Sequence, residues 1–279
     1  MPVGFRRLLW PTISHGSLVL AMPYDLLSVG FTINVMLANA LKISPFSVAG
    51  RLIRLPLAFV PKNMIVRVPT GINKGSRWVT GTGTSNGCWI GTYEADHMSV
   101  LPRLVRPGMI AYDVGANAGY YTLALSRLVG DLGRVYAFEP GAQTASALRR
   151  HIQLNRLNNV TLVQAAVTDR PGLVGFQGFQ VVSDIDYVVP SISLDGFVAM
   201  GYPAPSFVKM DIEGAELAAL SGSRSILSCN ALWMMATHSD ELREQCRCIM
   251  AEYGYRFTGF DGNDPGNDFI AMKDGGLQS

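Results

Sequence analysis

Hydrophobic residues follow two alternating patterns from about residue 108 to the C-terminus. Short apolar runs that end in turn residues predict buried strands, and apolar residues recurring every three or four positions predict amphipathic helices. The runs predict strands at residues 109–115, 134–140, 160–166, 206–212 and 231–238. The segments between and after them predict helices at residues 120–130, 142–155, 214–227 and, behind an N-cap at Ser239, 240–253.

Two further strands close the chain, at residues 255–260 and 268–272, with only a turn rich in Gly, Asp, Asn and Pro between them. Because parallel neighbours need a long crossover and this pair has none, it predicts an antiparallel edge. The whole pattern predicts an α/β fold with a mostly parallel, seven-stranded sheet, helices on both faces and an antiparallel C-terminal edge. Ligands of such sheets bind beyond the carboxyl ends of the strands, near the point where the strand order reverses.

The N-terminal third of the chain lacks this rhythm. We therefore expect a hydrophobic, helical extension at residues 1–70, a Gly- and aromatic-rich segment at 71–107, and a cofactor-binding domain at 108–279. In the middle segment Trp89 and Tyr93 flank glycine residues, and aromatic faces suit sugar or ring-shaped acceptors. This segment is predicted to cap an acceptor site; a short hairpin that seals the sheet edge is the alternative.

The composition changes this picture little. The 279 residues are 48% hydrophobic, and a formal charge of +2 gives no chain-wide attraction to nucleic acid. The four cysteines form no C-x-x-C pair, which predicts free thiols in a reducing, cytoplasmic compartment. Residues 17–41 carry one charge but are too interrupted to predict a membrane span or a signal peptide. They predict either a helix packed on the domain or a partner, or a peripheral membrane contact through residues 17–60.

The turn after the first of the alternating strands has the unusual sequence "YDVGANAGYYT". In a dinucleotide-binding fingerprint counted from Gly115, glycines would stand at Asn117 and Tyr120, so a pyrophosphate is disfavoured. Asp113, before the turn, would also repel a phosphate. A small-residue turn with incidental acids is the alternative to a ligand site.

A cationic ligand with a ribose suits this turn better. Asp113 ends one strand, the turn leads into a helix N-terminus, and Glu139 ends the next strand, where it can accept both ribose hydroxyls. S-adenosylmethionine has an ammonium, a carboxylate, a ribose and a sulfonium, which match these features. The residues therefore predict S-adenosylmethionine as the cofactor.

Several segments also resemble one known family. Four of them resemble the FkbM family of S-adenosylmethionine-dependent methyltransferases: "DVGANAGYYTLALS", "RVYAFEP", "NNVTLVQAAVTD" and "VKMDIEGAELAAL". Further upstream, "KGSRW" with "GCWIGTYE" is similar to the segment that precedes the first strand in that family. The resemblance covers about residues 74–272 and implies a Rossmann-like class I enzyme that methylates a hydroxyl oxygen. Most members have an acidic residue before the histidine that ends the fifth strand, whereas Ala236 and Thr237 precede His238 here. The expected cofactor-binding residues are Asp113, Gly115, Asn117, Gly119, Tyr121, Glu139, Ala165, Ala166 and Asp211.

The candidates for chemistry lie at the ends of the fourth and fifth strands. His238 is expected to be the general base, because imidazole titrates nearest to neutral pH. Asp211 and Glu213 are the other candidates for the base; Asp211 is expected instead to position the acceptor or the cofactor, and Lys209 to stabilise a developing alkoxide. No metal is expected, since no cluster has ligand spacing, although Asp211 and Glu213 together leave a magnesium site as an alternative. His15 and His97 are expected to be surface or loop residues, and His151 is expected on a polar helix face.

The predicted acceptor is a sugar, glycolipid or polyketide-like small molecule, and no nucleic acid is expected as a partner. One alternative is an RNA methyltransferase, because basic residues cluster at Arg51, Arg54, Arg67, Lys74 and Arg77. Enzymes that methylate exocyclic base nitrogens commonly carry a Pro- and aromatic-containing element after the fourth strand, which "KMDIEGAE" lacks. The other alternative is a non-catalytic S-adenosylmethionine-binding scaffold. The sequence does not indicate the oligomeric state.

Overall fold

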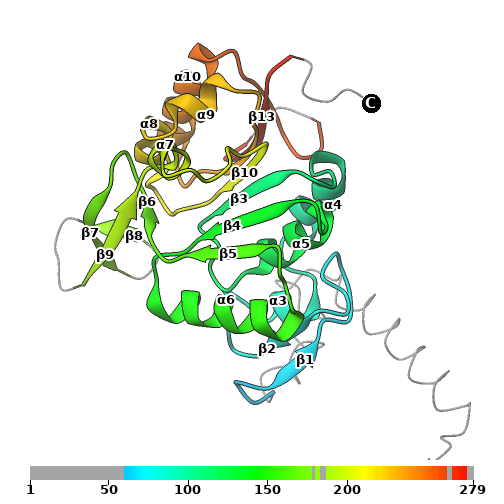
Figure 1. The fold of residues 1–279 in the computed structure, drawn as a ribbon. Helices are drawn as coiled ribbons and strands as arrows, with labels where there is room; N and C mark the ends of the chain where they lie inside the picture. The colour runs from blue at the N-terminus through cyan, green and yellow to red at the C-terminus, as the bar shows by residue number, and fades with distance from the viewer. Residues whose placement is uncertain (1–59, 178–179, 183–186, 263–265, 275–279) are drawn as a thin grey trace, which may run out of the picture.

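The computed structural model describes residues 60–177, 180–182, 187–262 and 266–274 (Figure 1). The hydrophobic stretch at 17–41 and the predicted membrane contact through 17–60 lie outside these residues, apart from residue 60. Within the described ranges, no helix combines the length and the apolar character needed to cross a membrane. The four cysteines are free thiols, as predicted.

A seven-stranded sheet lies at the centre of the described part of the chain, in the order β12-β13-β11-β10-β3-β4-β5 (Figure 1). Its strands are β3 (Ile110–Val114), β4 (Arg134–Phe138), β5 (Val160–Val163), β10 (Phe207–Met210), β11 (Leu232–Ala236), β12 (Arg256–Thr258) and β13 (Asp268–Met272). The first five are parallel neighbours, and β13 pairs antiparallel with both β11 and β12. This arrangement confirms the predicted sheet and its antiparallel edge. The strand order reverses between β3 and β10, so a ligand site is expected at their carboxyl ends.

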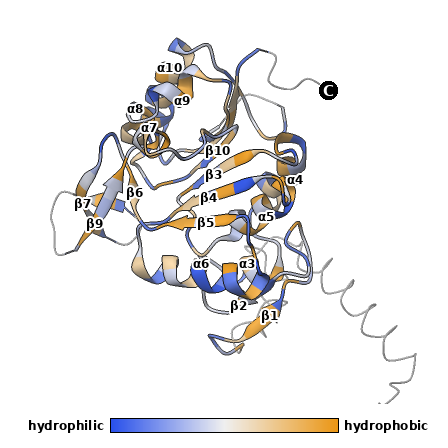
Figure 2. Ribbon diagram, viewed as in Figure 1, coloured by the Kyte–Doolittle hydropathy of each residue, from blue (hydrophilic) through white to orange (hydrophobic). Residues whose placement is uncertain are grey.

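Helices cover both faces of the sheet (Figure 1). One face carries α4 (Ala95–Leu104), α5 (Tyr120–Val129) and α6 (Ala142–Asn155), and the other carries α7 (Leu194–Ala199), α8 (Glu216–Ser221), α9 (Arg224–Ser228) and α10 (Asp240–Glu252). Neighbouring strand residues point to opposite faces, so Ala111 and Phe207 enter one core while Tyr112 and Val208 enter the other. Because both faces are covered, the central strands are mostly hydrophobic, with hydrophilic breaks on β3, β4 and β10, whereas α6 is mixed throughout (Figure 2).

Three segments differ from the sequence predictions. The single helix predicted at 214–227 is two helices, α8 and α9, which Gly222 and Ser223 separate. Gly222 packs closely against a neighbouring segment, since a Cβ atom there would lie 2.4 Å from the carbonyl oxygen of Thr168. The strand predicted at 160–166 ends at Val163, and an unpredicted sheet follows it. That sheet has the order β6-β9-β7-β8 and consists of β6 (Ala166–Val167), β7 (Gly172–Gln177), β8 (Gln180–Val182) and β9 (Val188–Ile192).

The segment before α4 also has defined structure. It forms an antiparallel pair, β1 (Ile65–Arg67) with β2 (Arg77–Val79), followed by the short helix α3 (Gly87–Ile90). Strand β2 packs along α6, so it covers a helix face that the sequence pattern predicts to be exposed.

His151 lies beneath this cover and is 0% exposed, which corrects the prediction of a polar helix face. Its Nε2 atom accepts a hydrogen bond from the backbone N–H of Val79 at 3.0 Å, and its Nδ1 donates to the carbonyl oxygen of Ala118 at 2.7 Å. The ring also stacks on Trp78, with centroids 4.0 Å apart. His151 therefore ties α6 both to β2 and to the glycine turn before α5.

We expect the free energy of unfolding to fall as the pH is lowered from about 6.5 to about 4, because burial lowers the pKa of His151 to about 4. In this pH window the unfolded chain binds the proton and the folded chain does not, so the stabilisation is complete above pH 6.5 and is lost towards pH 4. The shift corresponds to at most about 3 to 4 kcal/mol.

His151→Gln retains a donor and an acceptor but does not titrate, so it is the matched variant. Denaturant unfolding of both proteins between pH 4 and pH 7.5 measures the effect. The difference between the two proteins should change by most of the expected amount over this range. Parallel pH profiles would contradict the prediction.

Candidate active site

The turn between β3 and α5 is shaped by two glycines. Gly115 has a φ of 81°, and a Cβ atom there would lie 1.8 Å from the carbonyl oxygen of Asp211, because β3 and β10 are neighbours. Gly119 has a φ of 94°, and a Cβ atom there would lie 2.4 Å from the Cδ1 atom of Leu148. Both positions therefore require glycine for the backbone conformation and for close packing, whatever ligand binds.

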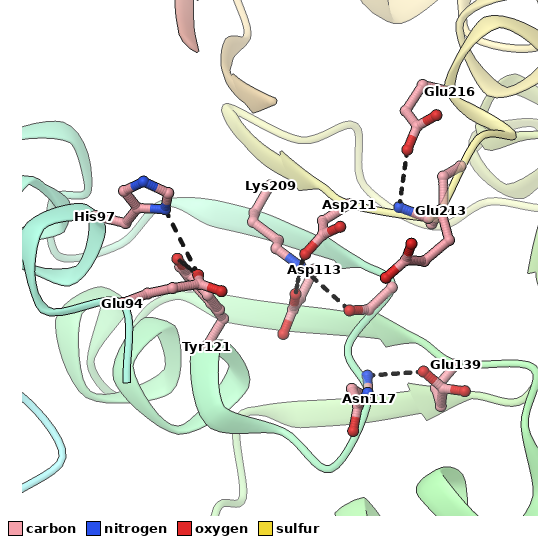
Figure 3. Close-up of polar contacts among 12 residues, drawn as sticks. Glu94, His97, Asp113, Asn117, Tyr121, Glu139, Lys209, Asp211, Glu213 and Glu216 are labelled. Atoms are coloured by element: carbon pink, nitrogen blue, oxygen red, sulfur yellow. Dashed lines mark hydrogen bonds and ion pairs between the residues drawn. The ribbon is translucent and has the colours of Figure 1, made fainter. Parts of the chain in front are cut away.

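Glu139 follows β4 and is buried beside this turn (Figure 3). Its Oε2 atom accepts from the backbone N–H of Asn117 at 2.7 Å, and its Oε1 accepts from the N–H of Gly141 at 2.8 Å and the hydroxyl of Thr144 at 2.6 Å. Burial raises the pKa of Glu139, and these hydrogen bonds and the charge of Lys209 only partly offset that effect. A carboxylate has about four acceptor sites, so one remains for a ribose hydroxyl, and a second hydroxyl would replace a present bond.

A cavity of about 1010 Å³, including its open mouth, lies at the carboxyl ends of β3, β4 and β10. Its apolar part is lined by Phe138, Ala165, Val167 and Phe176. This part suits a purine, Glu139 at its edge suits a ribose, and the N-terminus of α5 suits a carboxylate. The residues present therefore fit S-adenosylmethionine.

Most of the predicted cofactor-binding residues line this cavity. They are Gly115, Asn117, Tyr121, Glu139, Ala165, Ala166 and Asp211. Gly119 is not among the lining residues, although its neighbours Ala118 and Tyr120 are.

Asp113 does not line the cavity either and is 0% exposed. Its Oδ2 atom accepts from the hydroxyl of Thr122 at 2.5 Å, and its Oδ1 lies 3.9 Å from the Nζ atom of Lys209. The side chain therefore anchors the first turn of α5 and faces a buried cation. This arrangement corrects the prediction that Asp113 contacts the cofactor directly.

Lys209 lies at the boundary of the cavity and is 5% exposed. Its Nζ atom donates to the carbonyl oxygen of Gly115 at 3.2 Å and to Oδ2 of Asp211 at 3.4 Å, and it lies 4.9 Å from the ring centroid of Tyr121 (Figure 3). Burial alone would lower the pKa of Lys209, but the charges of Asp211, Asp113 and Glu94 outweigh it and raise the pKa. Lys209 is therefore a fixed positive charge.

A second cavity adjoins the first and shares part of its wall. The side chains that line both cavities include those of Glu94, Tyr121, Lys209, Asp211 and Glu213. The second cavity is completed by residues of β11 and of the segments after it, including Met234, His238, Phe260 and Asp268. The four predicted catalytic residues thus come together where the two cavities meet.

His238, directly after β11, faces three carboxylates. Its Nε2 atom lies 3.5 Å from Oδ1 of Asp211 and 3.3 Å from Oε2 of Glu213, and its Nδ1 lies 3.3 Å from Oε1 of Glu216. Glu216 is fully buried and accepts from two backbone N–H groups of the loop before α8, at 3.2 Å each. A rigid carboxylate at Nδ1 orients the ring and leaves Nε2 to exchange protons with a substrate.

The same side chains can hold a metal ion. Three atoms that could coordinate a metal, one each from Asp211, Glu213 and His238, all lie within 4.8 Å of one another. Sequence reasoning had paired only the two carboxylates for magnesium, and the tertiary structure adds His238. A metal on the Nε2 atom would prevent that atom from accepting a proton, so the two roles of His238 are alternatives.

Glu94 and His97 belong to the site although no role was predicted for them. Glu94 precedes α4 and accepts from the hydroxyl of Tyr121 at 2.5 Å. His97 lies 3.6 Å from Glu94 and 3.5 Å from Asp268. The only sequence signal was that Glu94 ends "GCWIGTYE", a stretch similar to the family's upstream segment.

The predicted acceptor-site cap contributes to these walls in part. Tyr93 and Glu94 line both cavities, and Trp78, Gly83, Thr84 and Cys88 line the cofactor cavity alone, although Trp78 is 0% exposed and belongs to the core. Trp89 does not line either cavity, and its Nε1 donates to the side chain of Asn86 at 3.1 Å. Contact of this segment with an acceptor stays a prediction.

Comparison with known families matches residues 113–257, over half of the chain, to the methyltransferase FkbM domain. This match confirms the resemblance, and S-adenosylmethionine is the cofactor of this family. A solved structure of methyltransferase FkbM from Methylobacillus flagellatus is similar with a TM-score of 0.45 and 18% identity, covering 68% of this chain and 55% of that one.

Two curated relatives match shorter parts of the chain. The ribosomal RNA large subunit methyltransferase E of Pseudomonas fluorescens is 27% identical over 131 residues, 45% of this chain and 57% of the relative. The ribosomal protein L11 methyltransferase of Caldanaerobacter subterraneus is 29% identical over 112 residues, 39% of this chain and 32% of the relative. The chain thus covers less than two thirds of either relative.

Proposed function

Because the chain belongs to the FkbM methyltransferase family, we propose that it transfers a methyl group from S-adenosylmethionine to a hydroxyl oxygen of a small molecule. The acceptor class is a sugar, a glycolipid or a polyketide-like compound. The observation that carries the proposal is the wall that the two cavities share. Lys209, Asp211 and Glu213 line both cavities, and His238 lines the second, within 3.5 Å of Asp211 and Glu213.

The chain's own residues perform the binding and the proton transfer. S-adenosylmethionine supplies an electrophilic methyl carbon, so the main tasks are to align the acceptor oxygen and to remove its proton. His238 accepts the proton at Nε2, and Glu216 stabilises the charge that the ring then carries. Lys209, fixed between Gly115 and Asp211, lowers the energy of negative charge that develops on the oxygen.

The charge of the second cavity supports a neutral acceptor. Its wall includes four carboxylates, those of Glu94, Asp211, Glu213 and Asp268. Their negative charges would repel the phosphates of RNA. RNA methylation therefore remains the less favoured alternative, although one curated relative is named as a ribosomal RNA methyltransferase.

Incubation of cell extracts with the purified protein and methyl-labelled S-adenosylmethionine, followed by mass spectrometry, tests this function. The label is expected on a hydroxyl of a nuclease-resistant small molecule or glycolipid. Label that disappears on nuclease digestion would indicate the RNA alternative. Cofactor binding without any transfer would indicate the scaffold.

Glu139→Ala is expected to weaken the binding of S-adenosylmethionine about ten- to a hundredfold. The reason is the loss of charge-assisted hydrogen bonds to the ribose, which contribute about 1.5 to 3 kcal/mol. Titration calorimetry measures the affinity. Thr144→Val serves as the control, because it removes one internal bond to Glu139 and leaves the carboxylate in place. An unchanged affinity in Glu139→Ala would refute the ribose assignment.

A further inference from the structure

Glu94 is a carboxylate on the wall that both cavities share. Burial alone would raise the pKa of Glu94, but hydrogen bonds from His97, Tyr121 and Tyr93 and the charge of Lys209 outweigh it and lower the pKa to about 2. Glu94 is therefore ionised throughout the neutral range and is unsuited to act as a general base. A fixed negative charge in a ligand cavity suits a cationic group of the ligand.

The backbone at Glu94 is in an uncommon conformation. Its φ of 43° and ψ of 47° lie in the left-handed region, which costs a residue with a Cβ atom about 1 to 2 kcal/mol. Such positions persist where the surrounding structure holds them, and they cluster at ligand sites. At Glu94 the hydroxyl of Tyr121 holds the carboxylate at 2.5 Å, so the strained residue has a fixed direction.

The other acidic residues near the cofactor cavity have different partners. Asp113 does not reach the cavity, and Asp211 pairs with Lys209 at 3.4 Å. Glu139 lies at the ribose end with three hydrogen bonds from the chain, and Glu213 faces His238 at 3.3 Å. Glu94 differs, since the groups that contact its carboxylate are the hydroxyls of Tyr121 and Tyr93 and the ring of His97, and Lys209 acts on it through its charge without a close ion pair.

The place of Glu94 also agrees with the shape of an amino acid. The carboxylate of the methionine part suits the N-terminus of the ten-residue helix α5, and the ammonium lies on the neighbouring carbon atom. Tyr121, which holds Glu94, is the second residue of that helix. Figure 3 shows Glu94 beside Tyr121, so an ammonium near the helix N-terminus would lie close to the part of the cavity wall that Glu94 forms.

We propose that Glu94 binds the α-ammonium group of S-adenosylmethionine and that Tyr121 orients its carboxylate. This assignment gives Glu94 the role that the sequence pattern had placed on Asp113. It rests on the cofactor of the proposed function and makes Glu94 a binding residue with no part in proton transfer.

A comparison of two ligands distinguishes binding of the ammonium group by Glu94 from an effect of Glu94 on the shape of the whole cavity. S-adenosylmethionine carries the amino-acid part, whereas 5′-deoxy-5′-methylthioadenosine has the same nucleoside and sulfur but no ammonium. Titration calorimetry with Glu94→Gln should show about a ten- to hundredfold loss of affinity for the first ligand and a change of less than about twofold for the second. Tyr121→Phe should show a smaller loss, again only for S-adenosylmethionine.

Asp268→Asn is the matched control, because it removes a carboxylate beside the same His97 ring but outside the cofactor cavity. It should leave both affinities unchanged. Glu94→Gly is a second variant that suits the left-handed backbone, so it should fold, bind methylthioadenosine and still lose affinity for S-adenosylmethionine.

The proposal is overturned if Glu94→Gln binds S-adenosylmethionine as the wild type does. It is equally overturned if Glu94→Gln and Glu94→Gly weaken both ligands by the same factor, because Glu94 would then shape the cavity as a whole. A wild-type protein that binds neither ligand would instead refute the cofactor assignment on which the proposal rests.

Discussion

Replacing His238 by alanine is expected to lower turnover by at least about a hundredfold while the affinity for S-adenosylmethionine stays unchanged. His238 lines the second cavity and not the cofactor cavity, so its loss should spare cofactor binding. Its Nε2 atom is in reach of Asp211 and Glu213, and the buried Glu216 holds its Nδ1 side. An acceptor hydroxyl would lose its proton acceptor in the variant.

The measurement is single-turnover methyl transfer, with cofactor affinity from calorimetry. Glu241→Gln is the control, because Glu241 is exposed in the first turn of the next helix, α10. Glu216→Gln should lower turnover by a smaller factor, since it keeps the ring in place but removes the charge behind Nδ1. Turnover near that of the wild type in His238→Ala would transfer the role to Asp211 or to alignment of the acceptor alone.

Gly115→Ala is expected to abolish detectable cofactor binding and to lower the free energy of unfolding by about 2 to 5 kcal/mol. The left-handed φ of 81° contributes about 1 to 2 kcal/mol of this loss. The remainder arises because the new Cβ atom would lie 1.8 Å from the carbonyl oxygen of Asp211. The ends of β3 and β10 must separate to make room, and the cavity is built on those two ends.

Gly108→Ala separates the two contributions. Gly108 has a φ of 84°, but a Cβ atom there would meet no atom within 4 Å, so only the conformational cost applies. Denaturant unfolding of both variants measures the difference, and calorimetry measures cofactor binding, which Gly108→Ala should retain. Equal destabilisation of the two variants would show that the contact with Asp211 is relieved without strain.

The long apolar runs predicted the central sheet correctly, because a strand covered on both faces is hydrophobic along most of its length. The charged residues Asp113 and Lys209 stand near the carboxyl ends of β3 and β10, where the cavity begins. The two closing strands predicted their antiparallel pairing for an equally local reason, the absence of a helix between them. The second sheet escaped prediction, since its strands are short and several of their apolar residues, such as Leu173 and Val188, are exposed. Its pattern therefore does not differ from that of a loop.

The sequence by itself determined the chemistry of the glycine turn and of Glu139, because the conformational freedom of glycine and the acceptor capacity of a carboxylate belong to single residues. Only the tertiary structure decided how the other side chains are used. Strand β2 buries His151 on a helix face that reads as polar, and Lys209 faces Asp113, which is enclosed beneath the cavity. Contacts between residues as distant in sequence as Glu94 and Tyr121 depend on how the elements pack, and no local periodicity encodes them.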